Sequence, residues 1–376
     1  MATTEEHGGP DWNFGASGKR LERLIDSALP GARIVRVVNM KPDAVSADAS
    51  SKGAGYGAPL RIDVVHGGRN KSLVLHTATS NEFGHDRRAD RAQEMILAAD
   101  TFGDIPGHVQ ALDVGAYRGE NEFVSLKDSG EFYLLSTYAE GRLYAEDLRS
   151  VAATRTARPL DIARADALAQ YLATLHAERP TASPGAYSRC IRDLLGSGEG
   201  IFGIVDGYPK DVPAAPPERL QRIEELCLEW RWRLRGGASR LSRTHGDFHP
   251  FNVLFDGQSR LSLLDTSRGS IGDPADDVTC MALNYAFFAL GHPGAWREAF
   301  RQLWDGFWRR YSALRPDEDL YEVAAPFLAW RGLVLANPKW YTELGAGDRE
   351  RLLSFVEHAL SRPRFLPDSA GEFFDT

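Results

Sequence analysis

The chain is poor in cysteine and contains no long apolar run. Its 376 residues include three cysteines, Cys190, Cys227 and Cys280, which are scattered and odd in number. This usage argues against a disulfide framework or a cysteine-based zinc site and is typical of reduced thiols. No apolar run approaches the roughly 20 residues that a membrane-spanning helix needs, and residues 1–10 lack the apolar stretch of a secretory signal. We therefore expect a cytoplasmic protein without a membrane partner.

The chain also lacks an excess of basic residues. Lys and Arg number 44 against 52 Asp and Glu, which gives a formal net charge of −8. Because nucleic-acid phosphates attract basic surfaces, this balance argues against nucleic acid as a main partner. The composition, 43% hydrophobic and 26% charged, is typical of a globular protein. The length allows two domains or one two-lobed unit with a large core, and no pattern indicates the oligomeric state.

Residues 17–139 predict a small N-terminal lobe, preceded by a flexible N-terminus at 1–16. Apolar residues at helical spacing predict a helix that Pro30 and Gly31 end. Gly67 and Gly68 lie in a six-residue connection, which indicates a hairpin. A charged helix at 86–99 interrupts the strands, so we expect a small five-stranded antiparallel sheet with one inserted helix. The expected strands are 34–38, 60–65, 72–76, 109–117 and 131–138.

Residues 140–362 predict a larger, mostly helical lobe, followed by a C-terminal tail at 363–376. Glu140, Gly141 and Arg142 break the strand pattern and are the expected hinge between the lobes. Trp304 and Trp308 lie at helical spacing, which is typical of core residues. The other tryptophans of this lobe are divided between the core and a possible acceptor pocket, where aromatic walls suit sugars or amines. Helices are expected to end near residue 176 and to cover 216–235, 275–290, 294–311, 318–335 and 347–360.

The most informative motif lies at residues 244–255. Asp247 precedes Asn252 by five residues, an apolar strand follows at once, and Asp265 closes the next apolar run. Phosphoryl transfer uses such a set, in which one carboxylate accepts a hydroxyl proton while an Asn and a second Asp hold the metal on the nucleotide phosphates. A polar hairpin turn is the structural alternative. That alternative accounts for Asp256 and Gly257 but leaves the residues before the strand unexplained.

At these residues the chain resembles the aminoglycoside phosphotransferase and choline kinase family, which are small-molecule relatives of protein kinases. The family's His-Gly-Asp-Leu-His-Pro-x-Asn loop matches residues 245–252, and its Gly-Asp-Pro-Ala-x-Asp-Leu segment matches residues 272–278. The resemblance implies a two-lobed, protein-kinase-like α+β fold with ATP and Mg²⁺ between the lobes. By this match Asp247 is the catalytic base, His245 orients the loop, Asn252 and Asp265 are magnesium ligands, and Asp277 braces the catalytic loop.

The sequence supports the nucleotide-binding site less fully than it supports the catalytic loop. Gly53 and Gly55 belong to a Gly-rich segment that is either a cover for phosphates, through its backbone amides, or a flexible linker. In the resembling family the third strand typically ends in a Lys that binds phosphates and meets a helical Glu. Here His76 holds the Lys position and Glu94 the Glu position, so His76 is either a substitute or a plain strand residue. In the second case Lys52, Arg61 or Lys71 supplies the charge.

Several further residues bear on the site. Tyr138 and its neighbours at 136–139 are expected to offer backbone groups to a purine, and ATP is not distinguished from GTP there. Asp273 precedes Pro274, which favours helix capping over metal binding. For Arg268 the sequence does not decide between a substrate contact, a phosphate contact and a surface charge. Histidines four apart in the motif lie in a loop, so no structural zinc is expected.

Taken together, the sequence predicts an ATP-dependent kinase that phosphorylates a hydroxyl of a small molecule, of the amino sugar, sugar or amino alcohol type. The alternative is a pseudokinase-like nucleotide-binding or regulatory protein, which the His76 position motivates. A protein kinase is disfavoured because no Ala-Pro-Glu segment follows Asp265.

Overall fold

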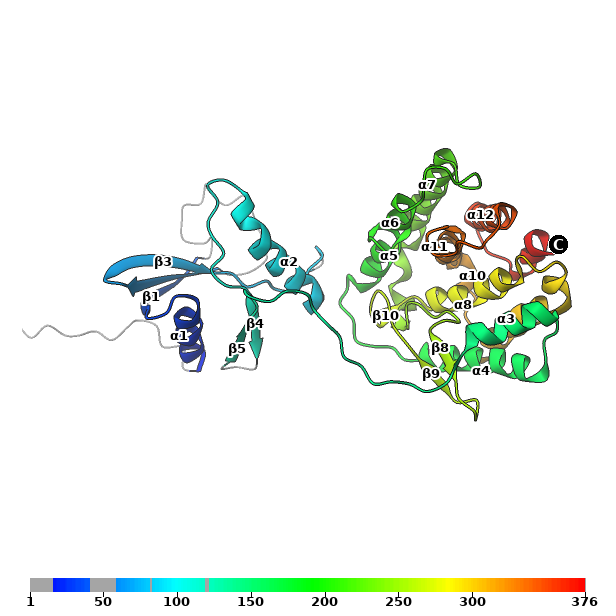
Figure 1. Cartoon of the computed structure of the whole chain (residues 1–376), viewed down its shortest axis with the longest axis horizontal. Helices are drawn as coiled ribbons and strands as arrows, with labels where there is room; N and C mark the ends of the chain where they lie inside the picture. Colours follow the sequence, from blue (N-terminus) through cyan, green and yellow to red (C-terminus); the bar gives the residue numbers. More distant parts are fainter. Residues whose placement is uncertain (1–15, 41–58, 82, 119–121, 376) are drawn as a thin grey trace, which may run out of the picture. The chain divides into compact units, whose positions relative to one another are not determined.

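The computed structural model describes residues 16–40, 59–81, 83–118 and 122–375. They belong to two compact units, Met1–Ser136 and Thr137–Thr376. The first unit contains small antiparallel sheets and short helices, and the second is mostly helical (Figure 1). The expected fold class, an α+β chain with two lobes of these kinds, is confirmed.

The main sheet of the first unit consists of the strands β1, β2 and β3 in that order, all antiparallel. Gly67 and Gly68 join β2 to β3 with φ angles of 57° and 74°, and His66 pairs directly with Arg69. Glycine adopts this left-handed backbone without steric cost, and two such residues make a turn that suits twisted strands. The hairpin connection is therefore tighter than the six residues expected from the sequence.

Helix α1 covers this sheet and closes a small core. Leu21 and Ile25 of the helix pack with Ile34, Ile62 and Val64 of the strands. The helix that the spacing predicts before Pro30 is thus confirmed. The elements of this unit are α1 Ala16–Ala28, β1 Arg33–Asn39, β2 Leu60–His66, β3 Arg69–Leu75, α2 Arg88–Thr101, η2 Phe102–Asp104, β4 Gly115–Arg118 and β5 Glu122–Ser125.

The expected five-stranded sheet is wrong. β4 and β5 pair only with each other among the described strands, and most of the expected strand at 109–117 is irregular. Residues 131–138 form no strand, and Tyr133 and Leu134 expose 92% and 93% of their surface. An apolar run favours a strand only where a neighbouring backbone supplies hydrogen bonds, which no described strand offers to this segment.

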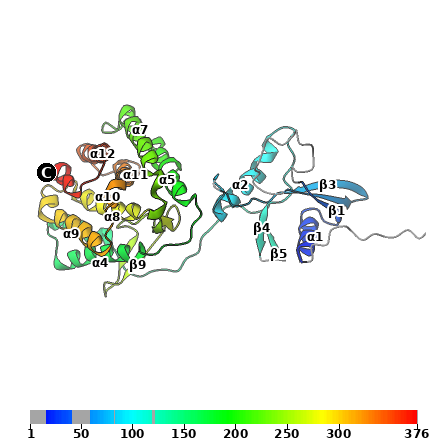
Figure 2. The same cartoon turned by 180° about the vertical axis from the view of Figure 1, so that it is seen from behind.

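The second unit is built around helix α8. This helix is apolar on nearly every side, so almost all of its residues are buried, as expected for a helix enclosed by others. It packs against α3, α4, α9, α10 and α11, and Figures 1 and 2 show it among these helices from both sides. None of the helices formed by the described residues has the length and apolarity to span a lipid bilayer.

The second unit also contains two small antiparallel sheets among its helices. The expected helices are confirmed, with the one at 318–335 divided into α10 and α11. The elements are β6 Arg142–Leu143, α3 Tyr144–Thr154, α4 Pro159–Leu175, α5 Ala186–Gly196, α6 Ile201–Asp206, α7 Pro217–Arg233, η3 Leu234–Arg240, β7 Ser242–Arg243, β8 Val253–Phe255, β9 Leu261–Leu263, β10 Ile271–Gly272, α8 Pro274–Ala289, η4 Trp296–Phe300, α9 Arg301–Leu314, α10 Leu320–Val323, α11 Ala325–Ala336, α12 Ala346–Leu360, η5 Pro367–Ala370 and α13 Gly371–Phe374.

The small strands position the motif. β8 pairs with β9, and β7 pairs with β10. The loop 244–252 runs from β7 to β8, and the loop 264–270 runs from β9 to β10. Because each loop begins and ends on a paired strand, the two loops lie side by side at the start of α8.

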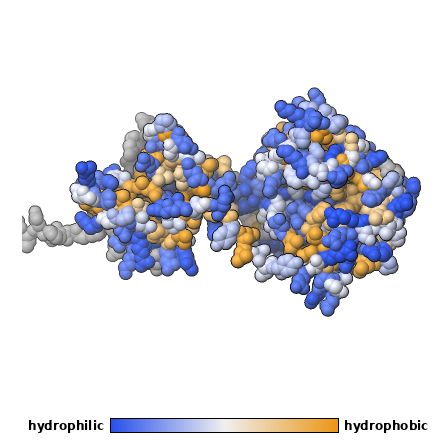
Figure 3. Space-filling view, viewed as in Figure 1, coloured by the Kyte–Doolittle hydropathy of each residue, from blue (hydrophilic) through white to orange (hydrophobic). Residues whose placement is uncertain are grey.

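An aromatic cluster closes the second unit at its C-terminal end. Trp304 and Trp308 of α9 are buried, which confirms their expected place in the core. Phe365 packs against both of them and against Phe355 of α12, and Trp304 donates a hydrogen bond to the Pro367 carbonyl (3.2 Å). The segment assigned to a C-terminal tail therefore packs on the core. Hydrophilic residues predominate on the face of this unit in Figure 3, with hydrophobic patches between them.

Removing the Phe365 ring tests this packing. Phe365 is 1% exposed, so Phe365→Ala leaves a cavity among the tryptophans and is expected to lower the free energy of unfolding by about 3–5 kcal/mol. Denaturant unfolding followed by tryptophan fluorescence measures the change. The neighbouring Leu366 is 55% exposed, so Leu366→Ala is the matched control and should change stability by less than about 0.5 kcal/mol. Equal effects of the two substitutions would contradict the packing.

Candidate functional site

The loop 244–252 is anchored to α8 by one carboxylate. The backbone amides of His245 and Gly246 donate hydrogen bonds to the two oxygens of Asp277, each at 2.8 Å. Gly246 has a φ of 82°, and a Cβ atom there would lie 2.0 Å from the Ser267 carbonyl oxygen. Only glycine fits this position without displacing the neighbouring loop. The expectation that Asp277 braces the loop is confirmed by these bonds.

A buried histidine supports Asp277 from the other side. His176, at the end of α4, places Nε2 3.1 Å from Asp277 Oδ2 and Nδ1 2.7 Å from the Tyr311 hydroxyl. Burial opposes ionisation of Asp277, but the hydrogen bonds from His176 and the His245 amide hold the pKa of the carboxyl below its ordinary value. The sequence places His176 at a helix end but gives no sign of this role, because the residue lies 101 positions from its partner.

The His245 ring links the loop to the strand that follows it. Its Nε2 lies 3.0 Å from the Leu264 carbonyl oxygen, and its Nδ1 lies 3.3 Å from the Asp247 amide nitrogen. A carbonyl needs a donor and an amide needs an acceptor, so these contacts are satisfied when Nε2 donates and Nδ1 accepts. Both ring nitrogens are engaged in structural bonds, which fits a loop-orienting residue better than a proton carrier.

Asp247 lies on the anchored loop with its side chain partly exposed. Its Oδ2 is 3.3 Å from both His249 Nε2 and Asn252 Nδ2. His249 Nδ1 accepts from the Phe251 amide (3.1 Å), so the proton on Nε2 points to Asp247. Burial favours the neutral acid, but the hydrogen bond from His249 outweighs it, together with the charges of Arg331 and Arg268, and the pKa of Asp247 lies below its ordinary value. The group is thus an ionised carboxylate whose Oδ1 lacks a strong donor, with Cys280 Sγ at 4.0 Å.

Asn252 and Asp265 flank the end of the β8–β9 ladder. The Leu264 amide donates to the Asn252 carbonyl (2.9 Å), which continues the strand register and brings the following residue, Asp265, close to Asn252. The Asn252 side-chain amide nitrogen binds the Asp247 carbonyl (3.1 Å), so its carboxamide oxygen is the atom left for a cation. Asp265 is exposed, with a φ of 48°. Exposed carboxylate and amide oxygens suit Mg²⁺, which keeps waters and phosphate oxygens as its other ligands.

The described residues contain no cluster of three or more His, Cys, Asp or Glu that could hold a metal ion. An ion held by Asn252 and Asp265 would therefore need further ligands, such as waters or phosphate oxygens. That arrangement is ordinary for phosphotransferases, in which metal ions bridge phosphate oxygens.

Two further acids at the start of α8 have structural partners. Asp273 accepts a hydrogen bond from the Ala275 amide (2.9 Å) and binds Arg240 through both oxygens, which confirms helix capping. Both carboxylate oxygens of Asp276 accept hydrogen bonds from Arg268 Nη2, each at 2.8 Å. The sequence alone does not distinguish this role of Arg268 from a substrate contact, a phosphate contact or a surface charge.

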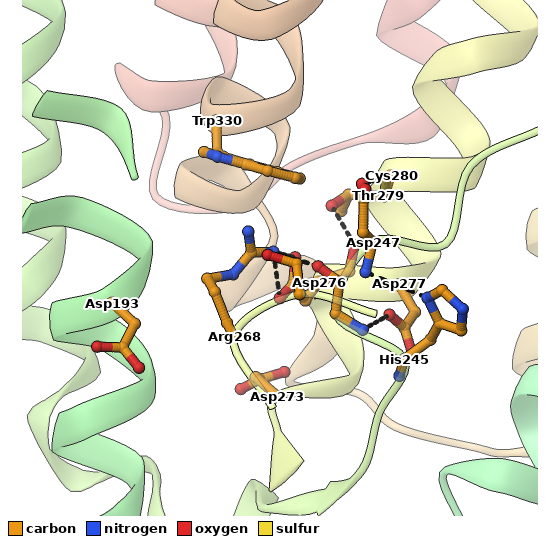
Figure 4. A network of polar contacts seen from close by, with 12 residues as sticks. Asp193, His245, Asp247, Arg268, Asp273, Asp276, Asp277, Thr279, Cys280 and Trp330 are labelled. Carbon is orange, nitrogen blue, oxygen red and sulfur yellow. Dashed lines mark hydrogen bonds and ion pairs between the residues drawn. The ribbon is translucent and has the colours of Figure 1, made fainter. Parts of the chain in front are cut away.

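Arg268 is a largely buried brace of the loop, with 9% of its side-chain surface exposed. Its Nη2 also donates to the Gly246 carbonyl (2.6 Å), and its guanidinium carbon lies 4.0 Å from the centre of the Trp330 ring. Figure 4 shows Trp330 over the pair of Arg268 and Asp276, with Cys280 beside Asp247. Asp277 binds the loop through its amides, whereas Arg268 binds the same loop through a carbonyl.

The structure supports the residues predicted to bind the nucleotide less than it supports those of the anchored loop. Gly53, Gly55 and Lys52 lie outside the described residues. His76 is exposed directly after β3 and bonds to no described residue. The structure brings Glu94 to His85 (3.1 Å), not to His76.

The other residues predicted to contact the nucleotide are either exposed or bonded to other side chains. Arg61 binds Asp63 (2.8 Å), and Lys71 lies 3.3 Å from a ring nitrogen of His66. Tyr138 is 89% exposed, and its backbone belongs to no described strand.

The comparisons with known proteins agree with the chemistry of the anchored loop. Residues 88–316 match the model of a phosphotransferase enzyme family. A comparison with curated proteins gave no match.

Three solved structures illustrate the structural likeness. A choline kinase from Streptococcus pneumoniae is 15% identical, with 92% of this chain and 99% of that chain covered and a TM-score of 0.35. An aminoglycoside-3′-phosphotransferase of type VIII is 18% identical, with 85% and 98% covered and a TM-score of 0.33. A glucosamine kinase is 15% identical, with 58% of this chain and 56% of that chain covered and a TM-score of 0.35. This chain thus spans just over half of the length of the glucosamine kinase.

Removing the anchoring carboxylate tests the site's architecture. Asp277→Ala leaves two amides and His176 without their buried acceptor, so it should lower the free energy of unfolding by about 3–5 kcal/mol. Amide hydrogen exchange at residues 245 and 246 should become faster in the same variant. Asp305→Ala, which removes a half-buried acid of α9 that pairs only with Arg301 on the same helix (3.6 Å), is the control and should do neither. Unchanged protection of the two amides would show that Asp277 does not hold the loop.

Proposed function

Because the chain belongs to the phosphotransferase enzyme family, we propose that it transfers the γ-phosphoryl group of ATP to a hydroxyl group of a small molecule. The observation that carries this proposal is the Asp247 carboxylate, which the anchored loop presents beside Asn252 with its Oδ1 free of strong donors. ATP is the proposed donor, with GTP as the alternative. The proposed acceptor is a sugar, an amino sugar or an amino alcohol.

In the proposed reaction Asp247 orients and deprotonates the acceptor. The hydroxyl oxygen attacks the γ-phosphorus, the bond from that phosphorus to the β–γ bridging oxygen breaks, and the hydroxyl proton passes to Asp247 Oδ1. The products are the phosphate ester and ADP. The low pKa of Asp247 keeps the carboxylate ionised at neutral pH, so it is ready to accept that proton.

The other loop residues hold this geometry. His249 and Asn252 fix Asp247 Oδ2, which aims the remaining oxygen at the acceptor. Magnesium, when bound by Asn252 and Asp265, neutralises charge on the transferring phosphates. Since positioning and charge neutralisation dominate phosphoryl transfer, small displacements of this loop are costly to the rate.

A nucleotide-binding regulatory protein is the second candidate. It is favoured by His76, which stands directly after β3 where the resembling family has a Lys. A coupled assay of ADP formation with amino sugars, sugars, choline and amino alcohols separates the candidates. Nucleotide binding without magnesium, combined with no turnover of any acceptor, would favour the regulatory protein.

Asp247→Asn tests the base directly. The amide cannot take up the proton, so kcat should fall by about 10²- to 10⁴-fold while the affinity for ATP and the melting temperature stay close to those of the unchanged protein. Asp256→Asn alters the acid of the adjacent hairpin turn and should keep its activity. A fully active Asp247→Asn variant would exclude Asp247 as the base.

Asn252→Ala and Asp265→Ala test the metal ligands. Each removes an oxygen donor, so the magnesium concentration for half-maximal activity should rise about 10-fold or more. Titration of magnesium at saturating ATP measures the shift, with Asp256→Asn again as the control. An unchanged magnesium requirement in both variants would place the metal elsewhere.

A further inference from the structure

Arg331 of α11 is a buried cation without a carboxylate partner among the described residues. It is 3% exposed, and its Nη2 donates to Asn284 Oδ1 (3.2 Å) and to the Tyr341 hydroxyl (3.4 Å). Its Nε is buried without an acceptor, and its Nη1 donates no hydrogen bond to a described residue. Three of the five guanidinium hydrogens are therefore unused. A buried charge is costly unless an opposite charge or strong acceptors accompany it.

Other buried arginines of this chain show what is missing. Arg240 binds the carboxylates of Asp273 and Asp317. Arg349 donates to two backbone carbonyl oxygens, each at 2.6 Å. Arg331 donates hydrogen bonds only to neutral partners, at longer distances, and the Asp247 carboxylate interacts with its charge without a direct bond. Its unused N–H donors would be satisfied by a further anion.

This cation lies beside the proposed base. Its charge contributes to the low pKa of Asp247. Hydrogen bonds also connect the two residues: Asn284 accepts from Arg331 Nη2 (3.2 Å) and donates to the Cys280 carbonyl (2.6 Å), and Cys280 Sγ lies 4.0 Å from Asp247 Oδ1. An anion bound at Arg331 is thus close to the oxygen that receives the acceptor proton.

The surroundings favour an acid over an amine. Arg268, across the Trp330 ring, is the other cation that lowers the pKa of Asp247, and Asp276 already pairs with it. Glu199, at the far end of the Trp330 indole, is exposed, and its carboxylate lies 3.4 Å from Ser267 Oγ. A cationic acceptor next to Asp247 would meet the unpaired Arg331, whereas an acid group would satisfy it.

We infer that Arg331 binds an acid group of the acceptor, a carboxylate or a phosphate, whose neighbouring hydroxyl faces Asp247. The acceptor is then a hydroxy acid, such as a sugar acid, in preference to a neutral sugar or an amine. This inference rests on the proposed phosphotransferase function and narrows its substrate class. Arg331 sets acceptor specificity and takes no part in the proton transfer.

Matched acceptors that differ by one acid group test the inference. The pairs are glycerate and glycerol, gluconate and sorbitol, phosphoglycerol and glycerol, and serine and ethanolamine. A carboxylate or phosphate member should be preferred by about 10- to 100-fold in kcat/KM, the range of a hydrogen-bonded charge pair. Arg331→Met should abolish this preference through KM for the acid, and Arg331→Lys should retain part of it. Arg219→Met removes an arginine that pairs with Glu350 and Glu357 and should leave the preference intact.

Three kinetic outcomes would overturn the inference. The first is a preference for the neutral or cationic member of every pair. The second is an equal loss of kcat on all acceptors in Arg331→Met, which would mean that Arg331 acts only on Asp247. The third is a rise in KM for ATP with every acceptor, which would assign Arg331 to the donor phosphates.

Calorimetric binding separates this inference from the proposed function. Glycerate, gluconate and phosphoglycerol are titrated into the protein with ADP and magnesium present. If no acceptor is phosphorylated but an acid binds, and Arg331→Met or Arg331→Lys weakens that binding about 10-fold, the acid site stands while the phosphotransferase function fails. If none of the acids binds to the unchanged protein, the acid site is overturned.

Discussion

The Asp277 carboxylate is the constraint on which the second unit's site depends. It is fully buried and accepts hydrogen bonds from the amides of two successive loop residues and from His176. Because α8 is enclosed by other helices, the loop that Asp277 holds is fixed relative to the core. These hydrogen bonds offset the cost of burying a carboxylate there. The same bonds therefore secure both the fold and the direction in which Asp247 points.

The start of α8 concentrates three acids, and each has a different partner. Asp273 caps the helix and binds Arg240, Asp276 binds Arg268, and Asp277 binds the loop. The helix dipole favours negative charge at this end. Asp277 is thus linked to the loop through backbone amides, and Asp276 is linked to it through Arg268 and a backbone carbonyl. Against this pattern of paired charges, Arg331 donates hydrogen bonds only to the neutral groups of Asn284 and Tyr341.

The sequence predicted the local elements better than their pairing. Helices of the second unit follow from apolar spacing, since a helix's hydrogen bonds are internal to its own segment. The β2–β3 hairpin follows from two glycines between apolar runs. The strand expected at 131–138 failed because an apolar run such as the one around Leu134 says nothing about which backbone lies beside it. For the same reason the pairing of Glu94 with His85 was not visible in the spacing of these residues.

The sequence by itself determined the chemistry of the anchored loop: a carboxylate, an amide and a second carboxylate at fixed spacing, with a capping Asp and a bracing Asp after them. Only the tertiary structure decided that Arg268 braces the loop, that His176 supports Asp277, and that Arg331 donates hydrogen bonds only to neutral groups near Asp247. A motif contains residues whose roles depend on neighbours a few positions away, so it can be read along the chain. Burial and ion pairing join residues many positions apart, such as Arg331 and Asn284, and they exist only once the helices have packed.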